Sequence, residues 1–201
     1  MFVDSDEYGL VWVNSGYTYF CIKIRSMNIY LVGYMGSGKS TIGKLLSGKI
    51  GFSHLDLDDF FEENYRISIM DFFRKYDEGV FRRIETNMLK KTIAYSNHII
   101  STGGGTPCFN NNMEIINTNG FSVYIQMHPK SLFDRLKHAR RPRPRTTSLD
   151  DEALKKRIKE DMVVREKYYQ QEQMEVKGED IDIDALAAKI TEKLNLSGLT
   201  G

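Results

Sequence analysis

The amino-acid sequence predicts an α/β fold, with a parallel sheet covered by helices on both faces. Short apolar segments alternate along the chain with longer segments whose apolar residues recur every three or four positions. This alternation is typical of strands joined by crossover helices. The chain has 201 residues, of which 41% are hydrophobic and 27% are charged, as in ordinary globular domains. No internal repeat and no linker divides the part after residue 26 into two domains.

The charges of the side chains nearly cancel, because 28 Lys and Arg stand against 27 Asp and Glu. A near-neutral total gives no reason to expect nucleic acid or an anionic membrane as a partner. No apolar run reaches the roughly 18 residues that cross a bilayer. The two cysteines are too few for a disulfide framework, and the four histidines lack metal-site spacing. We therefore expect a cytoplasmic monomer whose partners are small molecules.

Residues 1–26 form an N-terminal extension to the predicted domain. They begin with acidic residues, whereas a secretory signal begins with basic residues and an apolar block. Two apolar stretches, residues 10–13 and 17–24, are expected to pair as a short hairpin. We expect translation to start at Met27, with a small partner-binding appendage as the alternative role of the extension. The domain itself is expected to span residues 27–201.

The predicted strands are short, apolar and bounded by residues that end strands. The first, at 29–32, stops at Gly33, and another stops at three consecutive glycines that begin at Gly103. Ligands of such parallel sheets bind at the carboxyl ends of the strands. In chain order, strands are predicted at 29–32, 54–56, 97–101, 121–125 and 174–177.

The segments between these strands have the periodicity of helices. In the segment 39–50, the apolar residues Ile42, Leu46 and Ile50 fall on one face. Pro129 opens a later helix, since proline is favoured at the first helical position. Helices are predicted at 39–50, 57–65, 68–75, 79–95, 129–139 and 150–169, and a final amphipathic helix carries Ile183, Leu186, Ile190 and Leu194.

A phosphate-binding motif lies between the first strand and the first helix. Residues 33–41, GYMGSGKST, match the pattern GxxxxGK[ST]. In such a loop the backbone N–H groups and the helix N-terminus face phosphate oxygens. Lys39 is expected to span the β- and γ-phosphates, and Ser40 is expected to ligate Mg²⁺. The other residues predicted to bind ATP here are Gly36, Ser37, Gly38 and Thr41.

The loop leaves the acceptor of the phosphate open, because motors, GTPases, transporters and small-molecule kinases share it. A kinase of small molecules is favoured because the chain is short and lacks the guanine-reading pattern NKxD. Asp56 and Asp58 are two residues apart, so in extended backbone both point the same way. One could hold a Mg²⁺-bound water and the other an acceptor hydroxyl. The alternative is a helix N-terminus that favours Asp.

Arg82 and Glu85 are three residues apart and share a face of the helix predicted at 79–95. The planar fork of arginine suits a carboxylate ligand, and an ion pair between these two residues is the alternative. The three glycines at 103–105 allow a ligand to approach the backbone closely. The segment 140–145, RRPRPR, cannot be helical because of its prolines. We expect it to form a lid that brings an arginine over ATP and excludes water. A solvated basic loop is the alternative.

Together these motifs resemble the shikimate kinase family, the small P-loop kinases of aromatic amino-acid biosynthesis. The matching text between about residues 28 and 194 is GYMGSGKST, DLD, FRRIE, STGGG, the RP of the lid, and an arginine three residues before Tyr-Tyr. The resemblance implies a doubly wound, five-stranded parallel sheet of the nucleoside-monophosphate-kinase type, with a lid at about 140–150. It also implies transfer of the γ-phosphate of ATP to the 3-hydroxyl of shikimate, with Mg²⁺.

The resemblance further implies roles for single residues, with Lys39, Asp58 and Arg143 as the catalytic ones. Asp56 matches the residue that holds Mg²⁺ through water, and Asp58 the residue that binds shikimate and orients the attacking hydroxyl. Arg143 matches the lid arginine that reaches the transferred phosphate. The remaining matches are Arg82 and Arg165 for the shikimate carboxylate, Arg135 for adenine, Phe73 and Phe81 for the apolar walls, and Gly103, Gly104 and Gly105 for the pocket lining.

The lid departs from the family pattern, in which two aliphatic residues usually follow RP, because Arg145 and Thr146 stand there. Arg141 offers an alternative register for the lid arginine. The usual proline before the late tyrosine is also replaced, by Lys167. Two other functions stay open: a kinase of the same fold for another polyol acid such as gluconate, and a nucleotide-sensing module that binds ATP without transferring phosphate.

Overall fold

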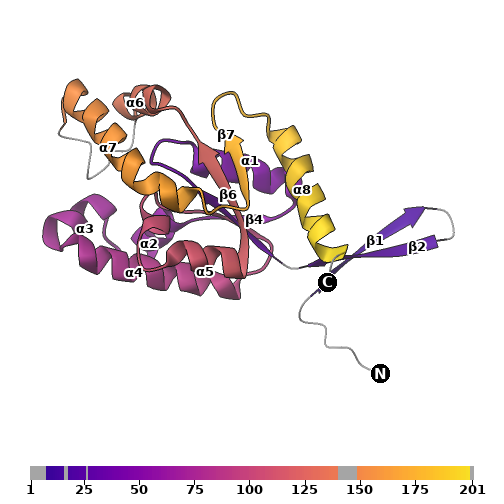
Figure 1. Ribbon diagram of the computed structural model, residues 1–201. Helices are drawn as coiled ribbons and strands as arrows, with labels where there is room; N and C mark the ends of the chain where they lie inside the picture. The colour runs from indigo at the N-terminus through magenta and orange to yellow at the C-terminus, as the bar shows by residue number, and fades with distance from the viewer. Residues whose placement is uncertain (1–7, 16–17, 26, 140–148, 200–201) are drawn as a thin grey trace.

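The computed structural model describes residues 8–15, 18–25, 27–139 and 149–199 (Figure 1). The strands are β1 (Tyr8–Ser15), β2 (Thr18–Arg25), β3 (Asn28–Val32), β4 (Ser53–Asp56), β5 (His98–Ser101), β6 (Gly120–Gln126) and β7 (Met174–Lys177). The helices are α1 (Lys39–Ile50), α2 (Leu57–Tyr65), α3 (Ile69–Lys75), α4 (Glu78–Lys91), α5 (Asn112–Asn119), α6 (Pro129–Lys137), α7 (Asp151–Tyr169) and α8 (Ile183–Leu199). Two short 3₁₀ turns are η1 (Thr92–Ala94) and η2 (Thr106–Cys108).

Five strands form one parallel sheet in the order β4-β5-β3-β6-β7. This arrangement confirms the predicted fold class. The central strand β3 is buried at every residue, as expected for a parallel strand that helices cover on both sides. Helices α1 and α8 lie on one side of the sheet, and α4 and α5 lie on the other (Figure 1).

Alternate residues of β3 belong to two hydrophobic cores. Ile29 and Leu31 pack with apolar residues of α1 and α8, whereas Tyr30 and Val32 pack with residues of α4, α5, α6 and α7. This separation follows from the period of two in a strand. A third cluster of four buried side chains joins α2, α3 and α4, and consists of Phe61, Phe72, Phe81 and Met88.

The predicted elements are confirmed to within two residues with one exception, and one segment of helix was not predicted. Helix α4 ends at Lys91 instead of continuing to residue 95, because η1 follows it. There the Thr92 hydroxyl donates to the Leu89 carbonyl at 2.7 Å. The segment that the sequence did not predict is α5 with the preceding η2. Its asparagine-rich text is a weak helix signal, and burial of Met113 and Ile116 stabilises it.

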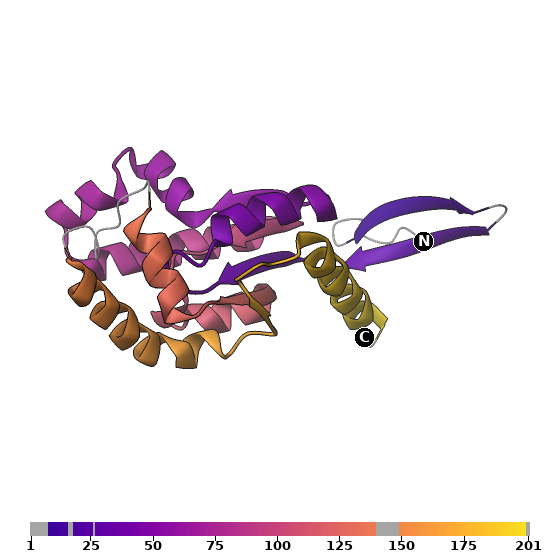
Figure 2. The ribbon, with the colours of Figure 1, turned by 90° about the horizontal axis from the view of Figure 1, so that it is seen from above.

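Strands β1 and β2 form the predicted hairpin, with Tyr8 opposite Arg25 and Ser15 opposite Thr18. The hairpin is a separate antiparallel sheet. It extends away from the parallel sheet beyond α8 (Figures 1 and 2). Most of the predicted lid, including Arg143, lies outside the described residues. Within the described ranges, no helix combines the length and apolar character that crossing a membrane requires.

Candidate active site

The phosphate loop curls tightly between β3 and α1, and glycine conformations allow it to do so. Gly38 directly precedes α1 with φ +96°, a left-handed conformation that side chains other than glycine rarely adopt. A Cβ atom on Gly33 would lie 2.7 Å from the Ile125 carbonyl oxygen of β6. The loop therefore packs directly on the neighbouring strand, and its backbone is shaped for close approach.

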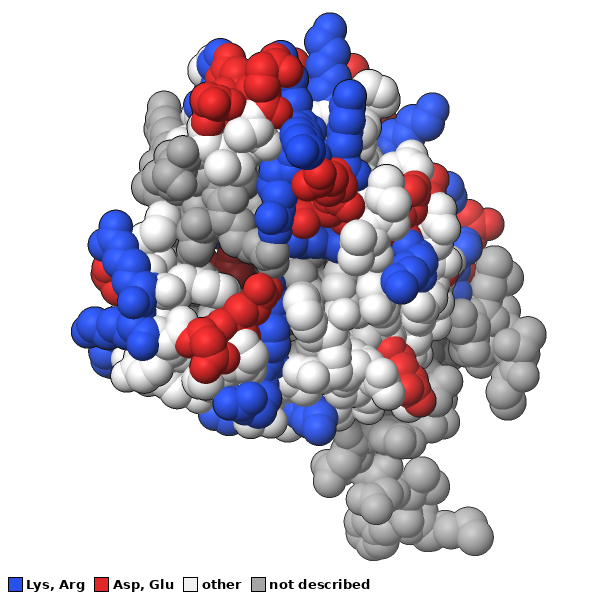
Figure 3. All heavy atoms as spheres, turned by 60° about the vertical axis from the view of Figure 1, so that its left-hand side comes forward, with Lys and Arg blue, Asp and Glu red and all other residues white. Residues whose placement is uncertain are grey.

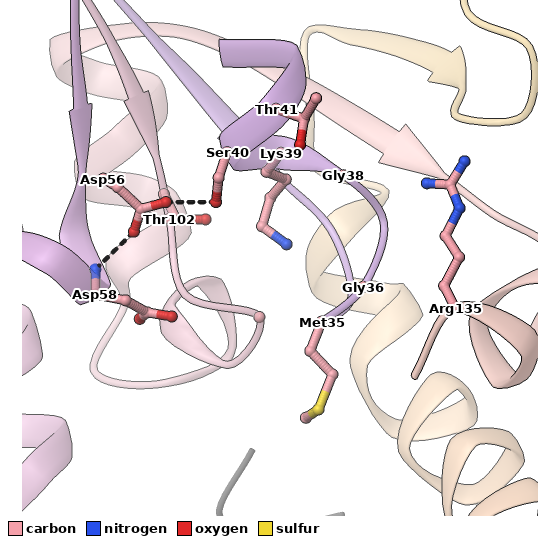
Figure 4. A pocket seen from close by; sticks show the side chains of 11 residues that line it. Met35, Gly36, Gly38, Lys39, Ser40, Thr41, Asp56, Asp58, Thr102 and Arg135 are labelled. Atoms are coloured by element: carbon pink, nitrogen blue, oxygen red, sulfur yellow. Dashed lines mark hydrogen bonds between the residues drawn. The ribbon is translucent and has the colours of Figure 1, made fainter. Parts of the chain in front are cut away.

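The side chain of Lys39 lies within this loop and is only 7% exposed. Its ammonium group donates hydrogen bonds to the carbonyl oxygens of Gly33 at 2.7 Å and Tyr34 at 2.8 Å. Figure 4 shows the side chain pointing into the space that the loop encloses. The positive charge is thus held where the motif places the phosphates of a nucleotide.

A pocket of about 330 Å³ opens at the carboxyl ends of β3, β4 and β5. Figure 3 faces the end of the molecule where α3 and α7 lie, and shows an acidic side chain at the bottom of a hollow. The pocket brings together nine predicted residues: Gly36, Gly38, Lys39, Ser40, Thr41, Asp56, Asp58, Gly104 and Arg135. Met35 and Thr102 also line it and were not predicted.

The side chains of Asp56 and Ser40 lie next to each other in the lining of the pocket (Figure 4). The Ser40 hydroxyl donates a hydrogen bond to one Asp56 oxygen. The other oxygen accepts from the backbone N–H of Asp58 at 2.9 Å, so Asp56 caps α2. The helix begins at Leu57 as predicted, so Asp56 and Asp58 do not share an extended backbone, and the alternative of a helix N-terminus is the one present. Both carboxylates nevertheless line the same pocket.

Arg82 lies on α4 and is only 8% exposed. Its guanidinium donates to Glu85 at 2.7 Å and to Glu78 at 2.9 Å. The ion pair between Arg82 and Glu85, which was the alternative to a ligand-binding role, is therefore present. Glu78 is the second carboxylate that holds the arginine. A Cβ atom on Gly105 would lie 2.6 Å from Nη2 of Arg82. The glycine backbone thus rests against the guanidinium.

Glu85 is a buried acid with two donors. Its carboxylate accepts from Arg82 and from the Thr106 hydroxyl at 2.6 Å. Burial raises the pKa of Glu85, although Arg82 and Thr106 oppose that shift. Thr106 was missed because the segment after the glycines was not predicted to fold back onto α4. The same is true of Phe109, whose ring centroid lies 4.4 Å from the Arg82 guanidinium carbon.

Arg165 reaches the same glycines from α7 and is 5% exposed. It donates to the Gly104 carbonyl at 3.3 Å and to Asp161 at 3.0 Å. Arg82 and Arg165, 83 positions apart in the sequence numbering, therefore meet at consecutive glycines. Two cations next to a carboxylate-lined pocket form a site suited to an anion that also carries hydroxyl groups.

The apolar residues and the remaining arginine predicted for the site flank the pocket. The rings of Phe73 and Phe81 lie 4.7 Å apart, and Phe81 lines a small cavity with Asp58 and Glu85. Arg135 donates to the Ser37 carbonyl at 3.3 Å and lies across the pocket from Asp56 and Asp58 (Figure 4). The two phenylalanines thus come from α3 and α4 on the side of Asp58, and Arg135 comes from α6 on the opposite side.

Comparisons with known proteins agree on one family. A protein-family model described as shikimate kinase matches residues 35–195. A shikimate kinase of Bacteroides thetaiotaomicron is 35% identical over 174 residues, covering 85% of this chain and 99% of that relative. Another, of Azobacteroides pseudotrichonymphae, is 42% identical over 144 residues, covering 71% of this chain and 85% of that relative.

Solved structures agree with the sequence comparisons. The crystal structure of the Bacteroides thetaiotaomicron shikimate kinase has a TM-score of 0.78 at 36% identity, covering 84% of this chain and 98% of the other. A shikimate kinase from Acinetobacter baumannii in complex with shikimate has a TM-score of 0.75 at 26% identity, covering 88% of this chain and 96% of the other.

Proposed function

The chain belongs to the shikimate kinase family of ATP-dependent kinases, and we propose that it transfers the γ-phosphate of ATP to the 3-hydroxyl of shikimate. The products are ADP and 3-phosphoshikimate. One observation carries this proposal: the phosphate loop, Asp58 and two buried arginines converge at the carboxyl ends of β3, β4 and β5. A phosphate donor and an anionic polyol acceptor then lie side by side.

Binding of ATP relies on the loop and on the start of α1. The backbone N–H groups and the N-terminus of α1 face the phosphates, and Lys39 turns from the Gly33 and Tyr34 carbonyls toward them. Arg135 borders the opposite wall of the pocket, where it contacts the nucleotide base. Phosphoryl transfer depends mainly on positioning and on stabilisation of charge. Lys39 contributes to both. Arg143, outside the described residues, stays a prediction.

The oxygen atoms of Ser40 and Asp56 fit a magnesium ion. Both side chains line the nucleotide pocket and contact each other, and hard oxygen ligands are those that Mg²⁺ prefers. In the part of the chain with described side chains, no three His, Cys, Asp or Glu residues gather as a metal cluster. Phosphate and water oxygens would complete the shell, as is usual for Mg²⁺. The ion would neutralise charge on the phosphates.

The acceptor is held by its carboxylate and its hydroxyl groups. Arg82 and Arg165 bind the carboxylate from two sides of the glycine segment. Asp58 orients the attacking hydroxyl and takes its proton as the new O–P bond forms. The bond between the γ-phosphorus and the β–γ bridging oxygen breaks, and ADP leaves. The rings of Phe73 and Phe81 enclose the carbon skeleton.

The first experiment measures ADP release from Mg·ATP by the purified protein with shikimate, with gluconate and without acceptor. We expect release that depends strongly on shikimate. Release with gluconate alone would favour the other polyol acids. ATP binding without release for any acceptor would favour the nucleotide-sensing module. The monomeric state and the cytoplasmic location stay predictions of the sequence.

A pair of neighbouring variants tests the role of the buried arginine. We expect Arg82→Ala to raise the KM for shikimate about a hundredfold and to leave ATP binding unchanged, because charge-assisted hydrogen bonds are lost. The matched control is Arg83→Ala, since Arg83 is exposed on the same helix. Equal weakening of ATP and shikimate by Arg82→Ala would contradict the assignment.

A further inference from the structure

Asp161 stands one helical turn before Arg165 on α7 and contacts three polar side chains. One of its carboxylate oxygens accepts from Arg165 at 3.0 Å and from the Tyr34 hydroxyl at 2.9 Å. The other lies 3.2 Å from Nε of Arg157. The Asp161 side chain is 13% exposed and that of Arg165 is 6% exposed. The carboxylate therefore accepts two hydrogen bonds and also forms an ion pair with the guanidinium of Arg157.

Tyr34 connects this cluster to the nucleotide side of the pocket. It is the second residue of the phosphate loop, and its carbonyl accepts from Lys39 at 2.8 Å. Its ring centroid lies 5.1 Å from the Arg165 guanidinium carbon. Burial, followed by the nearby Asp161 charge, raises the pKa of Tyr34, so its hydroxyl stays protonated and donates. Asp161 is thus fixed from the phosphate loop as well as from its own helix.

Two parallel hydrogen bonds from an arginine to a carboxylate require a defined orientation of the guanidinium plane, and binding costs less when that plane is already fixed. Asp161 holds Nη2 of Arg165, and the Gly104 carbonyl holds Nη1. The guanidinium has five N–H groups, so these two contacts set its plane and leave others for a ligand. An asparagine at 161 would remove the negative charge that attracts the guanidinium groups of Arg165 and Arg157. It would also replace one carboxylate oxygen by an NH₂ group, which accepts no hydrogen bond.

We propose that Asp161 is a positioning residue that fixes Arg165 for the carboxylate of the acceptor, with Tyr34 anchoring it to the phosphate loop. This inference rests on the proposed function. It assigns part of the preference for carboxylate-bearing acceptors to a residue that does not itself contact them.

The test compares Asp161→Asn with Glu160→Gln, which removes the same charge from an exposed neighbouring acid that lies 3.9 Å from Lys156. For Asp161→Asn we expect the KM for shikimate to rise about tenfold, with the KM for ATP unchanged and kcat within about threefold of wild type. For Glu160→Gln we expect all three to match wild type. A lower KM for shikimate in Asp161→Asn would overturn the proposal, because it would mean that Asp161 competes with the shikimate carboxylate for Arg165.

Shikimate methyl ester, used as a competitive inhibitor, separates positioning from a structural role. The ester lacks the anion, so Asp161→Asn is expected to leave its inhibition constant within about twofold of wild type. Equal weakening of shikimate and ester, or a weakened affinity for ATP, would overturn the proposal. Wild-type activity with shikimate is measured in the same series, and its absence would refute the proposed function instead.

Tyr34→Phe gives a second test that changes no charge. We expect about a threefold rise in the KM for shikimate, and no further rise when the change is added to Asp161→Asn. Fully additive effects would overturn the anchoring role of Tyr34. Thermal unfolding of each variant verifies that it is folded.

Discussion

At the residue scale, the three glycines after β5 set how closely two arginines approach the acceptor site. A Cβ atom on Gly105 would meet three atoms of the Arg82 guanidinium at 2.6–2.8 Å. Two carboxylates hold that guanidinium, so it cannot move away without losing an ion pair. The glycine is required by a side chain that lies 23 positions earlier in the sequence numbering.

Gly105→Ala is therefore expected to displace Arg82 and to raise the KM for shikimate at least about tenfold, which is roughly the loss of one charge-assisted hydrogen bond. The KM for ATP is expected to stay unchanged, because the phosphate loop is not touched. Steady-state kinetics with each substrate varied in turn measures both. An unchanged KM for shikimate would show that Arg82 does not bind the acceptor.

His54 on β4 gives a prediction of pH dependence. Its Nε2 lies 3.0 Å from the Ser101 hydroxyl, and burial lowers the pKa of the ring, with Asp56 opposing. A lowered pKa means that the folded state prefers the neutral ring. The contribution of this neutral ring to the stability of the folded state is fully present above the pKa of the unfolded state, which is about 6.5. It is lost as the pH falls through the lower pKa of the folded state.

Denaturant unfolding of wild type and His54→Gln between pH 7.5 and 5 measures this effect. We expect the difference in free energy of unfolding between the two proteins to shrink as the pH falls, because only the wild type has a ring that takes up a proton more readily in the unfolded state than in the folded state. A difference that stays constant over this range would contradict the assignment to His54.

At the element scale, helix α1 carries two interior glycines with opposite surroundings. Gly43 faces the sheet, and a Cβ atom there would lie 2.6 Å from the His54 ring and 2.7 Å from the Ser101 hydroxyl oxygen. Gly48 is exposed, and a Cβ atom there would have no neighbour within 4 Å. The close packing of α1 on β4 and β5 therefore depends on Gly43 and not on Gly48.

We expect Gly48→Ala to stabilise the protein by ~0.5–1 kcal/mol, since glycine is a poor helix former. Gly43→Ala is expected to destabilise it by ~1–3 kcal/mol, since the added methyl group overpacks the helix–sheet contact. Each variant serves as the control for the other in denaturant unfolding. A gain in stability for Gly43→Ala would show that α1 moves freely on the sheet.

At the scale of the whole molecule, the chain builds two sheets that share no strand. The parallel sheet with its helices contains every site residue found in the described part of the chain, whereas β1 and β2 pair only with each other. The Bacteroides thetaiotaomicron relative is matched over 99% of its length by 85% of this chain. The fold of the site therefore does not depend on strand pairing with the hairpin.

Removal of residues 1–26 is expected to leave kcat and both KM values within about twofold of the full chain, because the site residues found in the described part of the chain all lie after residue 26. The same kinetic assay on the two proteins measures this, with thermal unfolding as the control for folding. Inactive or insoluble protein would show instead that the hairpin, which lies against α8, contributes to the stability of the domain.

The strands, most of the helices, the phosphate loop and the resemblance to the family could be predicted from the sequence, because each depends on local periodicity or on a short contiguous motif. Helix α5 could not, because its asparagine-rich text is a weak helix signal. The resemblance to the family also predicted Arg82 and Arg165 as site residues, but not all of the side chains and carbonyl groups that hold the two arginines in place. The tertiary structure was needed to show that Thr106 binds Glu85 across 21 positions and that Tyr34 binds Asp161 across 127. Such pairs have no local pattern, since they exist only once helices on one face of a sheet converge at its carboxyl edge.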